Sequence, residues 1–215
     1  MKYTTIIFDL DGTLLNTLAD LAAATNHALA EHKLPQRTTE EVRQFVGNGI
    51  RKLIERAVPA DTPAELQEEV FASFNRYYKQ HCADSTRPYD GVPQLLQQLR
   101  TAGCCTAIVS TKADYGVQAL AKQYFNGQLD AACGERAGIA KKPAPDMLLA
   151  IMQQLKAEPA STIYIGDSDT DIATASNAGV DCIGACWGFR GRAFLEAHGA
   201  KLLAETVGDI WKLIK

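Results

Sequence analysis

The sequence contains no apolar stretch long enough to span a bilayer, and no cleavable signal pattern precedes its N-terminal apolar run. Its six cysteines include no CxxC pair, which argues against a zinc site and against a disulfide framework. The net charge of −3 provides no basic surface for nucleic acid or for an anionic membrane. Internal repeats and low-complexity segments are also absent. We therefore expect a cytoplasmic protein with reduced thiols.

The composition is that of an ordinary globular protein. Hydrophobic residues make up 47% of the 215 residues and charged residues 22%. This length is sufficient for one large domain or two modest ones.

The most informative segment lies near the N-terminus, where the apolar run Ile6–Phe8 leads directly into Asp9, Asp11 and Gly12. The run predicts a strand that is buried on both faces, as in a parallel sheet. The two aspartates then lie at the carboxyl end of the strand, where open α/β sheets bind ligands. Two carboxylates at i and i+2 share a face, and a bound cation would relieve their repulsion. The plain alternative is a solvated Asp-Gly turn.

Two kinds of pattern divide the chain. Residues 17–85 contain no convincing strand and predict about four helices, one opened by a Thr38–Glu41 capping box and one by Thr62 with Pro63 at the first helical position. From Pro88 onward strands alternate with helices, which indicates a parallel sheet covered on both faces. We therefore predict an α/β protein with a doubly wound parallel sheet formed by residues 1–15 and 86–215, and a helical insert at 16–85. The strands expected after the insert are 104–109, 129–133, 162–165, 182–185 and the region 201–203.

Polar groups follow several of these strands. The strand at 104–109 leads into Ser110, the strand at 162–165 leads into Gly166–Asp171, and Lys142 lies between them. Because the carboxyl ends of parallel strands meet at one edge, we expect these groups to lie beside Asp9. Each has a simpler interpretation: Ser110 as a helix cap, Lys142 as a solvated lysine, and the aspartates of 167–171 as carboxylates facing a helix N-terminus.

The order Asp-x-Asp-Gly-Thr, Ser/Thr, Lys-Pro and Gly-Asp-x-x-x-Asp resembles the four motifs of the haloacid dehalogenase superfamily, most of whose members are Mg-dependent phosphatases. The resemblance covers nearly the whole chain and implies a Rossmann-like core with an inserted helical cap. Three further segments, 46–54, 88–92 and 187–190, are similar to the phosphoglycolate phosphatase branch. Two positions depart from that branch: Ser110-Thr111-Lys112 replaces its usual Thr-Asn-Lys, and Asn16 stands where related members often carry Asp.

The resemblance implies hydrolysis of a small phosphorylated metabolite. In that chemistry Asp9 attacks phosphorus to form an aspartyl-phosphate, and Asp11 first protonates the leaving oxygen and then accepts a proton from water. Ser110 and Lys142 would hold the remaining phosphoryl oxygens.

Mg²⁺ is the implied cofactor, because its preference for hard oxygen ligands suits the Asp9 carboxylate, the Asp11 carbonyl and the Asp167 carboxylate. Asp171 would hold a metal-bound water or orient Lys142. The further substrate-binding residues expected are Leu10, Gly12, Thr13, Thr111 and Lys112 in the core and Gly47, Asn48, Gly49 and Arg51 in the cap.

In the resembled branch the loop at Gly47–Gly49 faces the active site and selects the leaving group. Arg51 and Lys52 follow this loop and would meet an anionic leaving group. A plain turn between two helices explains the same glycines equally well.

Other functions remain open. Within the hydrolases the alternatives are a pyrophosphatase and a broad sugar-phosphate or nucleotide phosphatase. A phosphomutase similar to β-phosphoglucomutase shares the cap and the motifs, whereas a dehalogenase gives Asp11 no role. A binding module without catalysis would not need the complete set of acids and bases. The sequence leaves both a monomer and a homodimer open.

Overall fold

The computed structural model describes residues 1–215, which form two compact units. The first unit contains residues 1–16 and 88–215, and the second contains residues 17–87. None of the helices combines the length and the apolar character needed to cross a membrane. All six cysteines are free thiols, in agreement with the sequence prediction.

The first unit is built on a parallel six-stranded sheet with the order β5-β4-β1-β6-β7-β8, which confirms the predicted doubly wound α/β fold. The strands are β1 (Thr5–Phe8), β4 (Cys105–Ala113), β5 (Ala131–Glu135), β6 (Thr162–Gly166), β7 (Asp181–Ala185) and β8 (Leu202–Ala204). The four residues of β1 are fully buried, as their uninterrupted apolar pattern predicts.

The strand order changes direction beside β1. On one side β1 pairs with β4, with Ile7 opposite Ala107, and on the other side it pairs with β6, with Ile7 opposite Tyr164. In doubly wound sheets the ligand site lies at the carboxyl ends of the strands where the order reverses. The residues that follow β1 and β6 therefore occupy the favoured position for a site.

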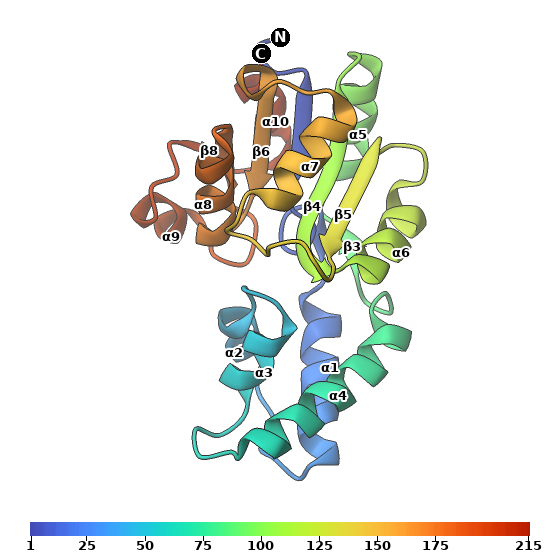
Figure 1. The fold of residues 1–215 in the computed structure, drawn as a ribbon, viewed down its shortest axis with the longest axis vertical. Helices are drawn as coiled ribbons and strands as arrows, with labels where there is room; N and C mark the ends of the chain where they lie inside the picture. Colours follow the sequence, from blue (N-terminus) through green and yellow to red (C-terminus); the bar gives the residue numbers. More distant parts are fainter. The chain divides into compact units, whose positions relative to one another are not determined.

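Helices cover both faces of this sheet (Figure 1). On one face α7 and α8 pack on a core that includes Ile7, Val109 and Tyr164. On the other face α5 packs on β4 and on α10. The helices of this unit are α5 (Val92–Thr101), α6 (Asp114–Phe125), α7 (Asp146–Leu155), α8 (Asp169–Ala178), α9 (Arg192–Ala197) and α10 (Val207–Leu213), with a 3₁₀ turn at Pro159–Ser161.

The second unit consists of four helices, the number expected from the sequence, around a core formed largely by leucine, alanine and aromatic side chains. They are α1 (Leu18–Glu31), α2 (Thr39–Phe45), α3 (Ile50–Ala57) and α4 (Ala64–His81). The short strands β2 (Leu15–Asn16) and β3 (Arg87–Pro88) pair with each other where the chain passes between the units. The Thr38–Glu41 capping box is present as predicted.

One carboxylate ties together the two ends of this helical insert. Asp20, in the first turn of α1, is 3% exposed and accepts hydrogen bonds from the backbone N–H groups of Ser85 and Thr86 and from the Thr86 hydroxyl. These donors lie just before the chain leaves the insert. The entry and exit of the insert are therefore fastened inside the insert itself.

Three sequence predictions of local structure were wrong in their bounds. The helix expected to begin with Pro63 at its first position begins at Ala64, because Pro63 is extended, with ψ 148°. Strand β5 begins two residues later than expected, at Ala131. Strand β4 continues to Ala113 through a register shift, so it includes Ser110 and does not end at Val109.

Candidate active site

Asp9 lies immediately after β1, at the reversal of the strand order. Its backbone N–H continues the pairing by donating to the Ile165 carbonyl of β6 at 2.8 Å. Its side chain is buried and accepts a hydrogen bond from the Lys142 ammonium at 2.9 Å. The Asp9 carboxylate is thus buried at the carboxyl edge of the sheet, next to the buried Lys142 ammonium.

Lys142 is 6% exposed and donates to three protein atoms. These are Asp9 Oδ1 at 2.9 Å, Asp171 Oδ1 at 2.7 Å and the Tyr164 hydroxyl at 2.8 Å. An ammonium has three N–H donors, so the full set is satisfied. Burial alone would lower the pKa of Lys142, but the carboxylates of Asp171 and Asp9 outweigh it and hold this pKa well above its ordinary value. Lys142 is therefore a fixed positive charge and not the solvated lysine considered as an alternative.

Tyr164 is the member of this network that sequence reasoning missed. It lies within β6, is fully buried, and its hydroxyl donates to the Val109 carbonyl at 2.8 Å while accepting from Lys142. The sequence does carry a signal for Tyr164: it places a tyrosine in a strand that is predicted to be buried. A buried tyrosine hydroxyl needs a hydrogen-bond partner.

The two acidic residues that follow β6 have different surroundings. Asp171 is saturated with donors: Lys142 bonds one oxygen, and the Ser168 N–H and hydroxyl bond the other at 3.1 and 2.6 Å in a capping box. Asp167 receives only the Phe189 N–H at 2.7 Å and a long bond from the Thr13 hydroxyl at 3.4 Å. Asp171 is thus engaged in holding Lys142 and α8, and Asp167 retains more capacity to bind another ligand.

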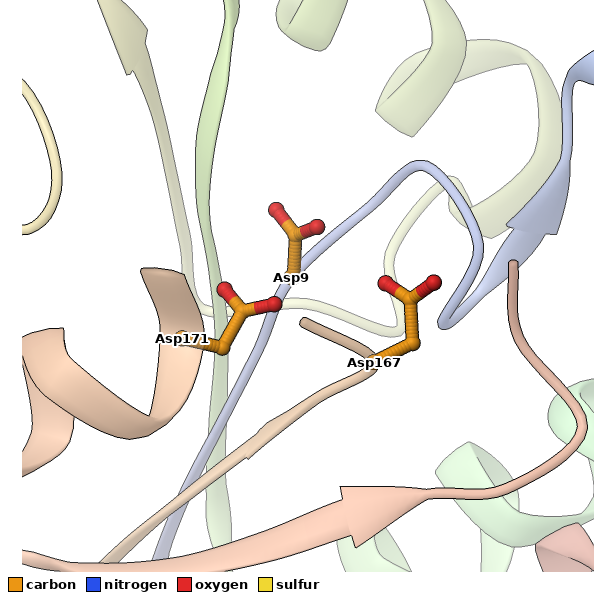
Figure 2. Close-up of side chains that lie close together, drawn as sticks. All are labelled: Asp9, Asp167 and Asp171. Atoms are coloured by element: carbon orange, nitrogen blue, oxygen red, sulfur yellow. The ribbon is translucent and has the colours of Figure 1, made fainter. Parts of the chain in front are cut away.

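Asp9, Asp167 and Asp171 each offer a carboxylate oxygen, and these oxygens all lie within 4.8 Å of one another (Figure 2). Burial raises the pKa of Asp9 to about 7, and Asp171 and Asp11 contribute to this shift. Burial also raises the pKa of Asp167 well above its ordinary value, with Asp171 and Asp9 adding to the effect. Lys142 alone does not neutralise the cluster. A hard divalent cation fits this site, because it would offset the remaining negative charge with oxygen ligands that are already present.

Asp11 has a different partner. Both of its carboxylate oxygens bond the Lys112 ammonium, at 3.0 and 3.1 Å. The Lys112 side chain is 4% exposed and that of Asp11 is 17% exposed, so this ion pair lies at the edge of the buried site. The two aspartates of the first motif are thus held by two separate lysines.

Ser110 lies inside β4, is 1% exposed, and its hydroxyl accepts from the Lys112 N–H at 3.3 Å. It does not cap α6, whose N-cap is Ala113, so that alternative was wrong. The register shift between Val109 and Ala113 places Ser110, Thr111 and Lys112 in the irregular stretch of the strand. Thr111 is half-buried there.

The turn after β1 is held by its own backbone. The Leu10 carbonyl accepts from the N–H groups of Thr13 and Leu15 at 3.3 and 2.9 Å, and the Gly12 N–H donates to the Leu15 carbonyl at 2.9 Å. Gly12 has a φ of 85°, which glycine adopts at little cost. The N–H groups of Gly12 and Thr13 therefore serve the turn itself.

The remaining predicted residues belong to the helical insert. Gly47, Asn48 and Gly49 form the turn between α2 and α3, all with positive φ. Arg56, which sequence reasoning missed, fastens this turn by donating to the Gly47 carbonyl at 3.3 Å and to Asn48 Oδ1 at 3.1 Å. Arg51 is exposed, forms an ion pair with Glu68 and lies over the Phe71 ring.

Comparison with known proteins agrees with this arrangement. Residues 6–185 match the family described as haloacid dehalogenase-like hydrolase. The phosphoglycolate phosphatase of Pseudomonas putida is 34% identical over 94% of this chain and 76% of its own length, and the N-acetylmuramic acid 6-phosphate phosphatase of Pseudomonas aeruginosa is 30% identical over 88% and 84%. The crystal structure of a "putative phosphoglycolate phosphatase" from Lactobacillus delbrueckii superimposes with a TM-score of 0.94 at 35% identity, covering 100% of this chain and 99% of that one. The chain belongs to the haloacid dehalogenase-like hydrolase family.

Proposed function

We propose that this protein is a Mg²⁺-dependent phosphomonoesterase that hydrolyses a small phosphorylated metabolite through an aspartyl-phosphate on Asp9, with phosphoglycolate as the first candidate substrate. One observation carries the proposal. At the reversal of the strand order, a buried carboxylate touches a fixed ammonium and lies beside a second carboxylate with spare ligand capacity. Phosphatases among the relatives support the choice of reaction.

In this reaction Asp9 attacks the phosphorus atom, and the alcohol of the substrate leaves. Asp11 gives a proton to the leaving oxygen, and it later accepts a proton from the water that releases phosphate from Asp9. Lys142 keeps the Asp9 carboxylate in place and offsets the negative charge that gathers at the site. Splitting the displacement into two steps replaces one high barrier by two lower ones.

The remaining roles follow from position. Ser110 and Thr111 contact the phosphoryl oxygens, and the turn containing Leu10, Gly12 and Thr13 shapes the site around them. Asp9, the Asp11 carbonyl and Asp167 are the proposed ligands of the cation, while Asp171 holds Lys142. The bound cation would supply positive charge toward the attacking carboxylate and the phosphoryl group.

Substrate choice belongs to the helical insert in this proposal. We propose that the helical insert acts as a cap whose Gly47–Gly49 turn and Arg51 read the leaving group. The relatives favour phosphoglycolate and, as a second candidate, a sugar 6-phosphate of the kind hydrolysed by the N-acetylmuramic acid 6-phosphate phosphatase.

A phosphate-release screen tests the proposal. The purified protein would be assayed with phosphoglycolate, sugar 6-phosphates, nucleotides, pyrophosphate and a sugar bisphosphate, each with Mg²⁺ and with a chelator. We expect free phosphate from a monoester only with Mg²⁺, and we expect Asp9→Asn to lower turnover by at least about a thousandfold with an unchanged circular dichroism spectrum. Substantial turnover by folded Asp9→Asn would refute the covalent route, and isomerised sugar phosphate without free phosphate would indicate a mutase.

A further inference from the structure

The segment that follows β7, Trp187–Phe189, contacts two of the strand ends that form the site, those of β1 and β6. The backbone N–H of Phe189 donates to Asp167 Oδ2 at 2.7 Å. Phe189 is 6% exposed, so this bond is shielded from water. A fixed backbone donor thus holds one oxygen of Asp167, which retains more ligand capacity than Asp171.

Gly188 fills a space that admits no side chain. A Cβ atom at this position would lie 2.5 Å from the Gly12 carbonyl oxygen and 2.6 Å from Asp167 Oδ2, closer than real Cβ atoms approach other heavy atoms. The obstacle includes backbone, which cannot rotate away as a flexible side chain would. Gly188 does not have a φ in the left-handed region, so its backbone conformation does not require glycine. The close approach of Gly12 and Asp167 is what requires it.

Trp187 contacts the turn that follows β1. Its indole N–H donates to the Thr13 carbonyl at 3.0 Å, and the Thr13 hydroxyl reaches the other oxygen of Asp167 at 3.4 Å. Asp167 is therefore held on both oxygens, by Phe189 directly and by Thr13, which Trp187 positions in turn. The contacts link the turn after β1 to the end of β6.

We propose that Trp187–Phe189 is a positioning segment that fixes the orientation of the Asp167 carboxylate and thereby sets the affinity for the divalent cation; this rests on the proposed function. The segment touches neither Asp9 nor the substrate-binding residues of β4 by any of these bonds. Groups that orient a metal ligand change metal affinity by about 10- to 100-fold when they are lost. Changes in Trp187–Phe189 should therefore alter the affinity for the cation more than they alter the rate of the chemical step.

Calorimetric titration of Mg²⁺ into metal-free protein tests this proposal. Gly188→Ala should weaken binding by about 10- to 100-fold. Trp187→Phe, which keeps the ring and removes the N–H, should weaken binding by a smaller factor, and its kcat should recover at saturating Mg²⁺. Gly208→Ala is the matched control, because its new Cβ would meet Thr206 Oγ1 at an ordinary 3.7 Å, and it should bind Mg²⁺ as the wild type does.

Thermal unfolding of each variant accompanies the titrations. Wild-type affinity in folded Gly188→Ala, or in Trp187→Phe if Gly188→Ala does not fold, would overturn the proposal. Absence of Mg²⁺ binding to the wild type would overturn it as well. A wild type that binds Mg²⁺ but hydrolyses no phosphate ester would refute the proposed function alone, and the variants would still decide the positioning role.

Discussion

Positive charge is placed differently at the candidate site of the sheet unit and on the surface of the helical insert. In the sheet unit, Lys142 is buried and shared among two carboxylates and a hydroxyl, at distances between 2.7 and 2.9 Å. In the helical insert, Lys52 and Arg51 are exposed, and their salt bridges are to single glutamates on the surface. The buried group can be changed only by disturbing several others, whereas each surface pair can change alone. The charges at the candidate site are therefore coupled to one another, whereas these surface pairs of the insert are independent.

Lys142→Met should have the largest effect, because it leaves Asp9 and Asp171 buried without their counter-ion. We expect a loss of about 3–5 kcal/mol in the free energy of unfolding and a fall in turnover of at least about a hundredfold. Lys52→Met breaks only the exposed pair with Glu55 and should cost less than about 1 kcal/mol. Urea unfolding and phosphate release measure both variants. Equal losses would erase the contrast between the units.

The raised pKa of Asp9 makes the stability of the metal-free protein depend on pH. The pKa of Asp9 is raised from 3.8 to about 7 in the folded protein, so the folded state binds more protons than the unfolded state between these values. The contribution of Asp9 to the stability of the metal-free protein should therefore fall as pH rises from 4 to 7 and then level off. Asp9→Asn removes this contribution and should gain stability relative to the wild type between pH 5 and pH 8.

Urea unfolding in the presence of a chelator, at pH 5, 6, 7 and 8, measures this difference. Asp61→Asn, which replaces an exposed aspartate of the insert, is the matched control. A constant difference between Asp9→Asn and the wild type across this range would contradict the expectation.

Tyr164→Phe tests a residue that acts only through others. Losing the hydroxyl leaves a Lys142 N–H and the Val109 carbonyl without this partner, which should cost about 1–3 kcal/mol of stability. We expect kcat to fall by roughly tenfold, the rate equivalent of about 1.4 kcal/mol, with KM little changed, because Lys142 is displaced while the substrate contacts remain. Steady-state kinetics separates the two parameters. A rise in KM with unchanged kcat would assign Tyr164 to substrate binding.

Arg51→Ala should have the smallest effect on stability, below about 1 kcal/mol, because its pair with Glu68 is exposed. If Arg51 reads an anionic leaving group, kcat/KM for phosphoglycolate should fall by about tenfold or more, in line with the roughly 1.5–3 kcal/mol of a charge-assisted contact. An uncharged aryl phosphate should be nearly unaffected. Arg51→Lys, which retains the charge, is the control. Equal losses with both substrates would assign Arg51 to the structure of the insert.

The sequence predicted the sheet well because the strands that follow the insert are short apolar runs bounded by turn residues. The burial of β1 follows from its own uninterrupted apolar pattern. The sequence also predicted that Asp9, Lys142 and Asp167 lie at one edge. The sequence could not predict which side chains at this edge are hydrogen-bonded to one another. The pairing of Asp11 with Lys112 and the part played by Tyr164 depend on side-chain positions across strands. Ser110 was misplaced because a register shift, which leaves no mark in composition, extends β4 past Val109.

The Asp20 fastening has a consequence for how the insert is accommodated. A long excursion of the chain ordinarily carries an entropic cost of bringing its ends together, which grows with the logarithm of its length. Because Asp20 holds the segment at Ser85 and Thr86 within the insert, that closure is made by the insert's own contacts. The β2–β3 pair and the bond from the Tyr89 N–H to the Leu14 carbonyl at 3.1 Å add to this closure. We therefore expect that an insert of another length can replace this one only if it carries comparable contacts at its base.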